Sequence, residues 1–311
     1  MGKIYDLIII GSGPAGLCAG IYAKRACLET ILFEDVVTQG GQITQTYEVD
    51  NYMGLSKING YDLASKFREH AKSLDLEIVA AKITSIDQVR DRIKLVKTKD
   101  TVYQTKAVIL ATGAYPANLG VDGEDKFRGQ GLSYCATCDG AFFKGKTVCV
   151  FGGGDVAVED AIFLSKMASK VYLIHRRDEL RASQILQNEL KACDNVDILW
   201  SYAPVSINGN EKIEYVTIKN LKDEKDYRLD VDGVFVAIGT KAESSLLAGK
   251  VEMKKNRIVA DETCRTTVPG IFAAGDVRTK QLRQVITAAA DGANAVTSAL
   301  HYLAELNQSK K

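Results

Sequence analysis

The chain has 311 residues, of which 46% are hydrophobic and 25% are charged. This length is enough for one large domain or two medium-sized domains, each with its own hydrophobic core. Its 40 basic and 39 acidic residues leave a formal net charge of +1. The bulk charge therefore excludes a strong general attraction to nucleic acid or to an anionic membrane, and neither is expected as a partner.

Apolar runs in the sequence are short. None approaches the roughly 20 residues that a membrane-spanning helix needs. The first run, residues 7–10, is followed at once by a glycine-rich segment, which is unlike the apolar part of a secretory signal peptide. We therefore expect a cytoplasmic protein without a membrane partner.

The first predicted element is a β-strand at residues 7–10, followed by a glycine-rich turn at 11–16, a helix and a strand at 30–34. A strand, the pattern G-x-G-x-x-G and a helix form the dinucleotide-binding fingerprint. Glu34 ends the second strand, where a carboxylate accepts hydrogen bonds from an adenosine ribose and repels a 2′-phosphate. This unit is expected to bind FAD through Gly11, Gly13, Ala15, Gly16 and Glu34.

The next chemically distinctive segment contains Cys135 and Cys138. In a C-x-x-C pair one thiol is commonly acidified, as dithiol–disulfide exchange requires. The alternatives are a pair of inert buried thiols and half of a zinc site, but the chain has only three histidines and its remaining cysteines stand singly, so no metal is expected. Asp139 follows the pair and is either a general acid for a leaving thiolate or a solvated turn carboxylate.

The five other cysteines have no partner at a suggestive spacing. We expect them to be small buried side chains: Cys18, Cys27, Cys149, Cys193 and Cys264. The predicted catalytic residues are therefore limited to Cys135, Cys138 and Asp139.

A second fingerprint repeats the first with an offset of 141 residues. It again consists of an apolar strand, a glycine turn, a helix and a strand ending at residue 175. Two fingerprints in register, each within a complete βαβ unit, are much more specific than one. The residues predicted to bind a second dinucleotide in this turn are Gly152, Gly154, Asp155 and Ala157.

The end of the second repeat differs from the first in charge. His175 stands where the first repeat has Glu34, and it is followed by Arg176, Arg177 and Arg181. Arginines can hold a phosphate by bidentate hydrogen bonds, whereas the alternative is an ordinary solvated face. At this position of a dinucleotide fold the arginines favour a 2′-phosphate, so we predict an NADPH site that includes His175 and the three arginines.

Near the C-terminal end, residues 267–276 predict a short buried strand that ends in Gly275 and Asp276. Asp276 can hydrogen-bond a ribitol hydroxyl of FAD, and Gly275 lets the chain approach the cofactor; an ordinary turn is the alternative. A helix predicted at residues 285–303 returns the chain to the first domain. The expected fold is α/β, with two Rossmann-like, three-layer nucleotide-binding domains: a discontinuous FAD domain (1–113 and 242–311) and an NADPH domain with the cysteine pair (114–241).

The cysteine pair precedes the second fingerprint by only 14 residues. One domain would then carry both the NADPH and the disulfide, although both must reach the same flavin. We therefore expect this domain to swing between two poses, with hinges around residues 112–116 and 237–240.

Together these motifs resemble the low-molecular-weight thioredoxin reductases over essentially the whole chain. The matching segments are GSGPAG at 11–16, GGQ at 40–42, CATCDG at 135–140, HRRDELRA at 175–182 and FAAGD at 272–276. The resemblance implies a homodimer that reduces thioredoxin, with one FAD and one NADPH site per subunit. It implies that Cys138 faces the flavin and leads the exchange with thioredoxin, that Cys135 resolves the mixed disulfide, and that Asp139 is the acid. It also adds FAD residues that spacing alone does not assign: Gly41, Gln42, Asn51, Arg283 and Gln284.

The predicted function is therefore an NADPH-dependent thioredoxin-disulfide reductase that passes electrons from NADPH through FAD to the Cys135–Cys138 disulfide. One alternative keeps this scaffold but serves a glutaredoxin-like protein or a peroxiredoxin. A flavin reductase of the ferredoxin–NADP type needs no dithiol, and a non-catalytic nucleotide sensor needs neither the cysteines nor the arginines. The sequence departs from the family at Tyr52–Met53–Gly54 and at Ala242–Glu243–Ser244, which bear on the flavin environment and on hinge stiffness.

Overall fold

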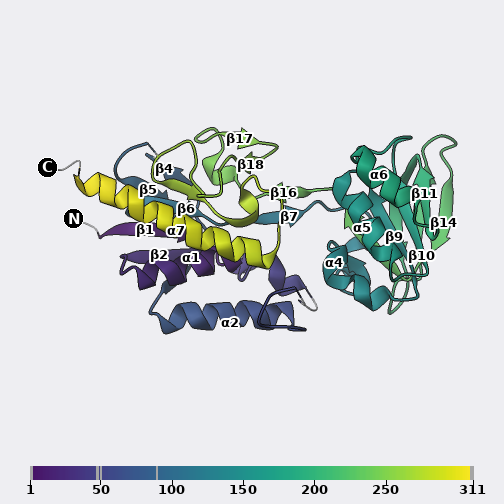
Figure 1. The fold of residues 1–311 in the computed structure, drawn as a ribbon, viewed down its shortest axis with the longest axis horizontal. Helices are drawn as coiled ribbons and strands as arrows, with labels where there is room; N and C mark the ends of the chain where they lie inside the picture. Colours follow the sequence, from purple (N-terminus) through teal and green to yellow (C-terminus); the bar gives the residue numbers. More distant parts are fainter. Residues whose placement is uncertain (1–2, 47–48, 50, 89, 309–311) are drawn as a thin grey trace. The chain divides into compact units, whose positions relative to one another are not determined.

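The structure is a computed structural model that describes residues 3–46, 49, 51–88 and 90–308. The chain divides into two compact units. The first contains Met1–Gln45, Val49–Tyr115 and Lys241–Lys311, and the second contains Pro116–Thr240 and a short segment that begins at Thr46. The first unit is thus assembled from segments that lie on both sides of the second in the sequence (Figure 1).

The first unit is built on a seven-stranded sheet with the order β3-β2-β1-β6-β5-β4, in which β19 also pairs with β6. Pairing is parallel except at β4 and β5. The strand β6 is long enough to pair with β5 along its first half and with β19 along its last residues. The strands are β1 (Ile4–Ile10), β2 (Thr30–Glu34), β3 (Glu77–Ala80), β4 (Ser85–Asp87), β5 (Lys94–Lys97), β6 (Val102–Leu110) and β19 (Ile271–Ala273).

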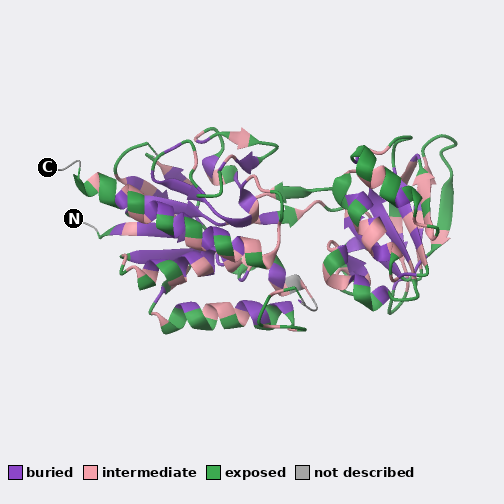
Figure 2. Cartoon of the chain, viewed as in Figure 1, coloured by how far each residue is buried: buried purple, intermediate pink, exposed green. Residues whose placement is uncertain are grey.

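Both faces of this sheet are covered. In β1, Leu7 and Ile9 enter one hydrophobic cluster, while Ile8 and Ile10 enter another on the opposite face. A central strand of a parallel sheet is buried on both sides, which explains the unbroken apolar run at residues 7–10. The first cluster is completed by α1 (Pro14–Arg25) and α7 (Val285–Gln308), whereas α2 (Gly60–Ser73) carries many exposed residues (Figure 2).

The second unit contains a five-stranded sheet with the order β11-β10-β9-β15-β8 and a three-stranded antiparallel sheet. The larger sheet is parallel throughout. Its strands are β8 (Leu132–Ser133), β9 (Thr147–Gly152), β10 (Lys170–His175), β11 (Val196–Trp200) and β15 (Gly233–Ala237). The remaining elements are β12 (Tyr202–Asn208), β13 (Tyr215–Asn220), β14 (Asp226–Asp230), α3 (Glu124–Phe127), α4 (Ala136–Asp139), the 3-10 turn η3 (Gly140–Phe143), α5 (Asp155–Ser165) and α6 (Gln184–Lys191).

Two short strands pair where the chain passes from one unit to the other and back: β7 (Ala114–Pro116) and β16 (Thr240–Ala242). The hydroxyl of Thr112 donates a hydrogen bond to the carbonyl of Glu243 over 2.5 Å. The other small elements of the first unit are β17 (Met253–Lys254), β18 (Arg257–Ile258) and the 3-10 turns η1 (Val36–Thr38), η2 (Gln42–Gln45), η4 (Ser245–Leu247) and η5 (Gly275–Val277).

The internal repeat has the same local structure in both copies. The helices α1 and α5 begin directly after Gly13 and Gly154, and both of these glycines are extended. Each helix connects two neighbouring parallel strands of its sheet. The predicted α/β class with two Rossmann-like units is confirmed.

Three details of the sequence prediction need correction or comment. The final helix continues to Gln308, beyond the predicted end at residue 303. Cys149 and Cys264 are buried as expected and Cys18 and Cys193 are partly buried, but the expectation of burial is wrong for Cys27. Cys27 lies in the surface turn after α1, with φ of 56°, and its side chain is exposed.

Within the described residues, no helix combines the length and the apolar character that a bilayer crossing demands.

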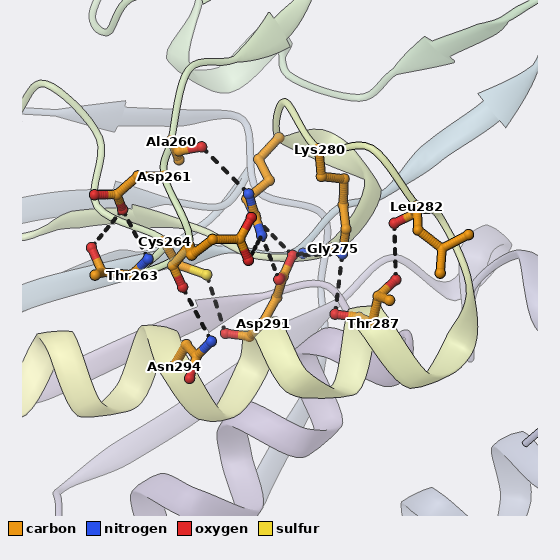
Figure 3. A network of polar contacts seen from close by, with 12 residues as sticks. Ala260, Asp261, Thr263, Cys264, Gly275, Lys280, Leu282, Thr287, Asp291 and Asn294 are labelled. Atoms are coloured by element: carbon orange, nitrogen blue, oxygen red, sulfur yellow. Dashed lines mark hydrogen bonds and ion pairs between the residues drawn. The ribbon is translucent and has the colours of Figure 1, made fainter. Parts of the chain in front are cut away.

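A buried ionic network connects the start of α7 to the turn after β19 (Figure 3). One carboxylate oxygen of Asp291, Oδ2, accepts hydrogen bonds from the Gly275 backbone N–H at 2.8 Å, from Arg278 Nε at 2.8 Å and from Lys280 Nζ at 2.9 Å. The other oxygen accepts from Arg278 Nη2 at 2.7 Å. Burial alone would raise the pKa of Asp291, but the hydrogen bonds and charges of Arg278 and Lys280 hold it below its usual value.

Replacing Asp291 with Asn should destabilise the first unit by about 3–5 kcal/mol, because it removes the buried counter-charge of Lys280 and leaves Arg278 with only the exposed Glu262. Urea unfolding followed by far-UV circular dichroism would show an earlier transition. The single tryptophan, Trp200, lies in the second unit, so its fluorescence should report an unchanged transition there. Asp125→Asn, at a side chain 96% exposed, is the matched control. A D291N protein as stable as this control would contradict the structural role of the network.

Candidate functional site

The first fingerprint forms a tight turn between β1 and α1. Gly11 has φ of +111°, and a Cβ at this position would lie 2.4 Å from the carbonyl oxygen of Ala111. A Cβ at Gly16 would lie 1.8 Å from the carbonyl oxygen of Gly11. The turn therefore requires glycine, and it leaves the free N–H groups at the start of α1 available to an anion.

A second glycine segment lies against this turn. The backbone N–H of Gly40 donates to Ser12 Oγ over 3.1 Å. A Cβ at Gly41 would stand 3.1 Å from the Cα of Gly13. The structure thus brings Gly41 next to the fingerprint, and the adjacent Gln42 begins η2 with an exposed side chain.

Glu34 is almost completely buried, with 2% of its surface exposed, at the end of β2. Arg68, from α2, donates two hydrogen bonds of 2.6 Å, one to each carboxylate oxygen, and Gln39 Nε2 donates a third at 2.8 Å. Burial would raise the pKa of Glu34, but the hydrogen bonds from Arg68, Ser12 and Gln39 lower it. A carboxylate has about four acceptor positions, and Arg68, Gln39 and Ser12 together use them, so a ribose hydroxyl would have to displace one of these donors.

Arg68 was not found by sequence reasoning. It lies in the middle of an ordinary amphipathic helix, outside every motif, and only the packing of α2 brings it to Glu34. No sequence signal distinguishes it from the other exposed basic residues of that helix.

Gly275 and Asp276 begin the turn after β19, beside the base of α7. Asp276 Oδ1 is buried and has no hydrogen-bond partner among the described residues. Its burial raises the pKa of Asp276, partly opposed by the charges of Lys280, Arg283 and Arg257. Arg257 donates to the backbone carbonyl of Asp276 and so supports this turn. Like Arg68, it was not among the residues that the sequence predicted for the site.

The residues implied by resemblance lie near the same helix terminus. Arg283 Nη2 donates to the carbonyl of Lys280 over 2.8 Å, while its Nε is buried without a partner in the described part of the chain. Asn51 Nδ2 donates to Gln284 Oε1 over 3.2 Å, which joins two segments 233 residues apart. Buried polar groups normally have partners. The unsatisfied atoms of Asp276 and Arg283, together with the glycine turn, suit a polar cofactor such as FAD.

The second unit carries the disulfide between Cys135 and Cys138. Their Cα atoms are 5.3 Å apart, and Cys135 is the residue that precedes the single-turn helix α4. Cys135 Sγ lies 3.4 Å from the hydroxyl of Thr137. The other five cysteines are free thiols. No cluster of three potential metal ligands occurs among the described residues.

Asp139 ends α4, one residue after Cys138. Its Oδ2 accepts a 2.6 Å hydrogen bond from Ser133 Oγ, while its Oδ1 is buried without a partner among the residues described. Burial raises the pKa of Asp139, and the hydrogen bond from Ser133 only partly opposes this. A carboxyl group of this kind retains its proton closer to neutral pH than an exposed aspartate does, as a general acid requires.

The second fingerprint places small residues between β9 and α5. A Cβ at Gly152 would lie 2.5 Å from the Cβ of Ala157, so this turn is as tightly packed as the first. His175 lies directly beneath it, 4% exposed, and a Cβ at Gly153 would stand 2.2 Å from His175 Nδ1. Burial lowers the pKa of His175, as do the three nearby arginines. The imidazole is therefore a neutral support for the turn.

The three predicted arginines of this unit are exposed: Arg176, Arg177 and Arg181. Within the described residues their guanidinium groups form no ion pair. The segment that carries them is fixed to the fingerprint, because Arg181 N donates to the Gly153 carbonyl over 2.7 Å and Ser183 N donates to Asp155 Oδ1 over 2.8 Å. Three unpaired guanidinium groups held beside a dinucleotide turn can bind a phosphate.

The predicted site residues thus separate by unit. Every residue predicted for FAD lies in the first unit, whereas the cysteines, Asp139 and every residue predicted for NADPH lie in the second. Ser133 and Tyr134 are additional residues of the redox segment that the sequence did not single out. Tyr134 donates to the buried carboxylate of Glu124 over 2.7 Å.

Comparison with known proteins identifies the family of this chain. The sequence model of the family described as "Pyridine nucleotide-disulphide oxidoreductase" matches residues 5–292. Proteins named thioredoxin reductase from Listeria innocua and Bacillus subtilis are 43% and 42% identical to this chain. The alignments cover 98% and 99% of the chain and 96% and 98% of those proteins.

Solved structures give the same result. The thioredoxin reductase of Streptococcus pyogenes is 41% identical, with a TM-score of 0.89 over 98% of this chain and 100% of that one. A structure described as a ferredoxin-flavin thioredoxin reductase from Clostridium acetobutylicum is 31% identical, with a TM-score of 0.52 over 98% of this chain and 99% of that one. The family model and the relatives match nearly the whole chain, and the chain belongs to the pyridine nucleotide-disulphide oxidoreductase family.

Proposed function

We propose that this protein is an NADPH-dependent thioredoxin-disulfide reductase that contains FAD. The observation that carries the proposal is the Cys135–Cys138 disulfide next to the buried carboxyl of Asp139, in the unit that also presents unpaired arginines beside a dinucleotide turn. The relatives named thioredoxin reductase, which match nearly the whole chain, support the same reaction.

The first unit would hold FAD. The free N–H groups at the start of α1 would bind the pyrophosphate, Glu34 would accept from the adenosine ribose, and Asp276 would accept from a ribitol hydroxyl. Further contacts are assigned to Gly41, Gln42, Asn51, Arg283 and Gln284. When bound, FAD accepts two electrons from NADPH as a hydride and passes them to a disulfide.

The second unit would bind NADPH and deliver the electrons onward. Gly152, Gly154, Asp155 and Ala157 form the pyrophosphate turn, His175 supports it from below, and the arginines hold the 2′-phosphate. When the Cys135–Cys138 bond is reduced, one sulfur takes a proton from Asp139 and leaves as a thiol.

Exchange with thioredoxin then returns the pair to its oxidised form. The Cys138 thiolate attacks the thioredoxin disulfide, so a mixed disulfide forms and one thioredoxin sulfur leaves as a thiolate, which takes up a proton. The Cys135 thiolate next attacks the Cys138 sulfur. This step re-forms the Cys135–Cys138 bond and releases the second thioredoxin thiol, so two electrons have moved to thioredoxin.

The location of both electron carriers on one unit supports a domain rotation. The NADPH site and the disulfide belong to the second unit, and each has to reach the flavin held by the first. The hinge positions proposed are residues 112–116 and 237–240, next to the paired strands β7 and β16. The domains assigned are 1–113 with 242–311 for FAD and 114–241 for NADPH.

The family resemblance further supports a homodimer, and the five free cysteines beside a working dithiol support a reducing, cytoplasmic setting. A glutaredoxin-like protein or a peroxiredoxin is the alternative acceptor, since the reacting groups would be the same. A panel of oxidised acceptors, assayed with NADPH under anaerobic conditions, separates these possibilities.

Replacing Cys138 with Ser should lower thioredoxin-dependent NADPH oxidation by at least about 10³-fold, because Cys135 alone cannot form the disulfide that carries the two electrons. Anaerobic stopped-flow absorbance should still show bleaching of the flavin by NADPH. Cys193→Ser, at a free thiol of the same unit, should behave like the parent protein. Normal thioredoxin turnover by the C138S protein would show that electrons do not pass through the cysteine pair.

The double replacement Arg176→Ala with Arg177→Ala should raise KM for NADPH by at least about 100-fold, since two charge-assisted hydrogen bonds of about 1.5–3 kcal/mol each would be lost. The KM for NADH, which has no 2′-phosphate, should change little. Arg228→Ala, at a surface ion pair with Asp230, is the control. Equal increases in KM for both nucleotides would contradict the phosphate assignment. If NADPH does not reduce the flavin of the parent protein, another electron donor must be sought. The printed name of the Clostridium relative, a ferredoxin-flavin thioredoxin reductase, suggests ferredoxin as the donor of that protein.

Replacing Asp276 with Ala should weaken FAD binding about 10- to 100-fold by removing a buried acceptor. Apoprotein titrated with FAD, followed by quenching of flavin fluorescence, would measure the dissociation constant. Asp261→Ala, whose carboxylate accepts hydrogen bonds from the nearby Thr263, is the control. Unchanged FAD affinity in the D276A protein would show that this carboxylate does not contact the cofactor.

A further inference from the structure

Ser133 lies at the centre of the redox segment. It is the last residue of β8, 6% exposed, and β8 pairs with β15 through Ser133 and Phe235. Its hydroxyl oxygen lies 2.6 Å from Asp139 Oδ2, 3.1 Å from Cys135 N and 3.3 Å from the Cys135 carbonyl oxygen. One side chain thus contacts the acid and both backbone groups of the first redox cysteine.

The hydrogen-bonding capacity of a hydroxyl matches these three neighbours. A hydroxyl has one hydrogen to donate and two lone pairs that accept. When Asp139 is ionised, Ser133 donates to its carboxylate and accepts from Cys135 N–H. When Asp139 is protonated, the carboxyl O–H can donate to Ser133 Oγ, and the hydroxyl hydrogen can turn to the Cys135 carbonyl. Both protonation states are then satisfied without movement of the backbone.

We propose that Ser133 is a positioning residue for the disulfide chemistry, whose rotating hydroxyl lets Asp139 give up and regain a proton beside Cys138. This inference rests on the proposed function, because it gives Asp139 the role of acid. The Ser133 hydroxyl holds the Asp139 carboxyl in one place both when it loses its proton and when it regains it. The proton is then available to the cysteine sulfur that leaves.

The redox segment has a second anchor that does not involve Ser133. Tyr134 donates to Glu124 Oε1 over 2.7 Å, and Glu124 also accepts from the backbone N–H groups of Leu119 at 2.9 Å and Gly120 at 2.7 Å. Loss of the Ser133 hydroxyl should therefore leave the segment attached. The expected defect is in proton transfer and in the orientation of Asp139.

The charged groups around Asp139 are few. The helix packed against α4 is α5, which carries Asp155, Glu159 and Asp160, while η3 has no charged residue. The carboxylates of α5 are present equally in every Ser133 variant. The thiols that form on reduction of Cys135 and Cys138 add the remaining titratable groups.

The test is the cleavage of the Cys135–Cys138 disulfide by dithiothreitol in the FAD-containing protein between pH 5 and 9. A dithiothreitol thiolate attacks one sulfur, the disulfide bond breaks, and the other sulfur leaves with the electron pair and takes the proton of Asp139. The second dithiothreitol thiol then closes its own ring and releases the second cysteine. Acid quenching, alkylation and mass spectrometry give the rate, which is divided by the thiolate concentration of the reagent.

In the parent protein this normalised rate should fall as pH rises through the pKa of Asp139, and Asp139→Asn should abolish the fall. Because the Ser133 hydroxyl donates to the ionised carboxylate, Ser133→Ala should move the midpoint upward by about one pH unit. It should also lower the maximal rate about tenfold, a reduction that we attribute to a less well oriented acid. Ser133→Thr should keep the parent profile, while Ser133→Val, of similar shape but without a hydroxyl, should follow the alanine variant.

Ser165→Ala, which removes a hydroxyl bonded within α5, is the control and should match the parent. A parental pH profile in both the alanine and the valine variants would overturn the proposal, as would equal profiles for the parent and Asp139→Asn. The readout needs neither NADPH nor thioredoxin. A protein that fails to reduce thioredoxin but shows the shifted midpoint would refute the proposed function and leave the role of Ser133 intact.

Discussion

The buried carboxylate of Asp291 is the interaction on which the first unit depends most directly. It accepts from Arg278, Lys280 and the backbone of Gly275, and so joins the start of the last helix to the turn that follows the last strand. That turn contains Asp276, and α7 packs on the same face of the sheet as α1. A buried ion pair need not be more stable than an apolar contact, but it specifies which groups meet. Here it places the C-terminal part of the discontinuous unit against the first fingerprint.

Four buried or half-buried carboxylates show how partner number separates structural acids from reactive ones. In Asp291 and Glu34 both oxygens accept hydrogen bonds from cationic side chains, and the pKa of each is lowered. In Asp139 and Asp276 one oxygen has no partner among the described residues, and burial raises the pKa of each. Carboxylates with both oxygens engaged fix the residues around them, and Glu34 would bind a ribose hydroxyl only in exchange for one of its present donors. Carboxylates with a free oxygen are the ones available to a cofactor hydroxyl or to a transferred proton.

The two repeats have the same backbone arrangement but carry opposite charges near the end of their second strand. Both place small residues at a tight turn before a helix, and both continue into a strand whose last residue is buried. In the first repeat that residue is Glu34, neutralised by an arginine from another helix. In the second it is His175, kept neutral by burial, and the arginines that follow it are exposed and form no ion pair with any residue the structure describes. Charge at the strand end is therefore what distinguishes the two predicted nucleotide sites.

The sequence by itself determined the class of fold, the two fingerprints and the redox pair, because each is a local pattern of small, apolar or sulfur-containing residues at fixed spacing. It also indicated Glu34, Asp139 and Asp276, since these follow directly from the ends of elements or from the cysteine motif. Only the tertiary structure decided that Arg68 binds Glu34, that Arg278 and Lys280 bind Asp291, and that Ser133 bonds to Asp139. It likewise showed Cys27 exposed, where composition favoured burial. These contacts join segments whose separation in the chain carries no periodic signal. A charged or polar side chain that becomes buried needs a hydrogen-bond partner, and the fold decides which residue lies near enough to be that partner.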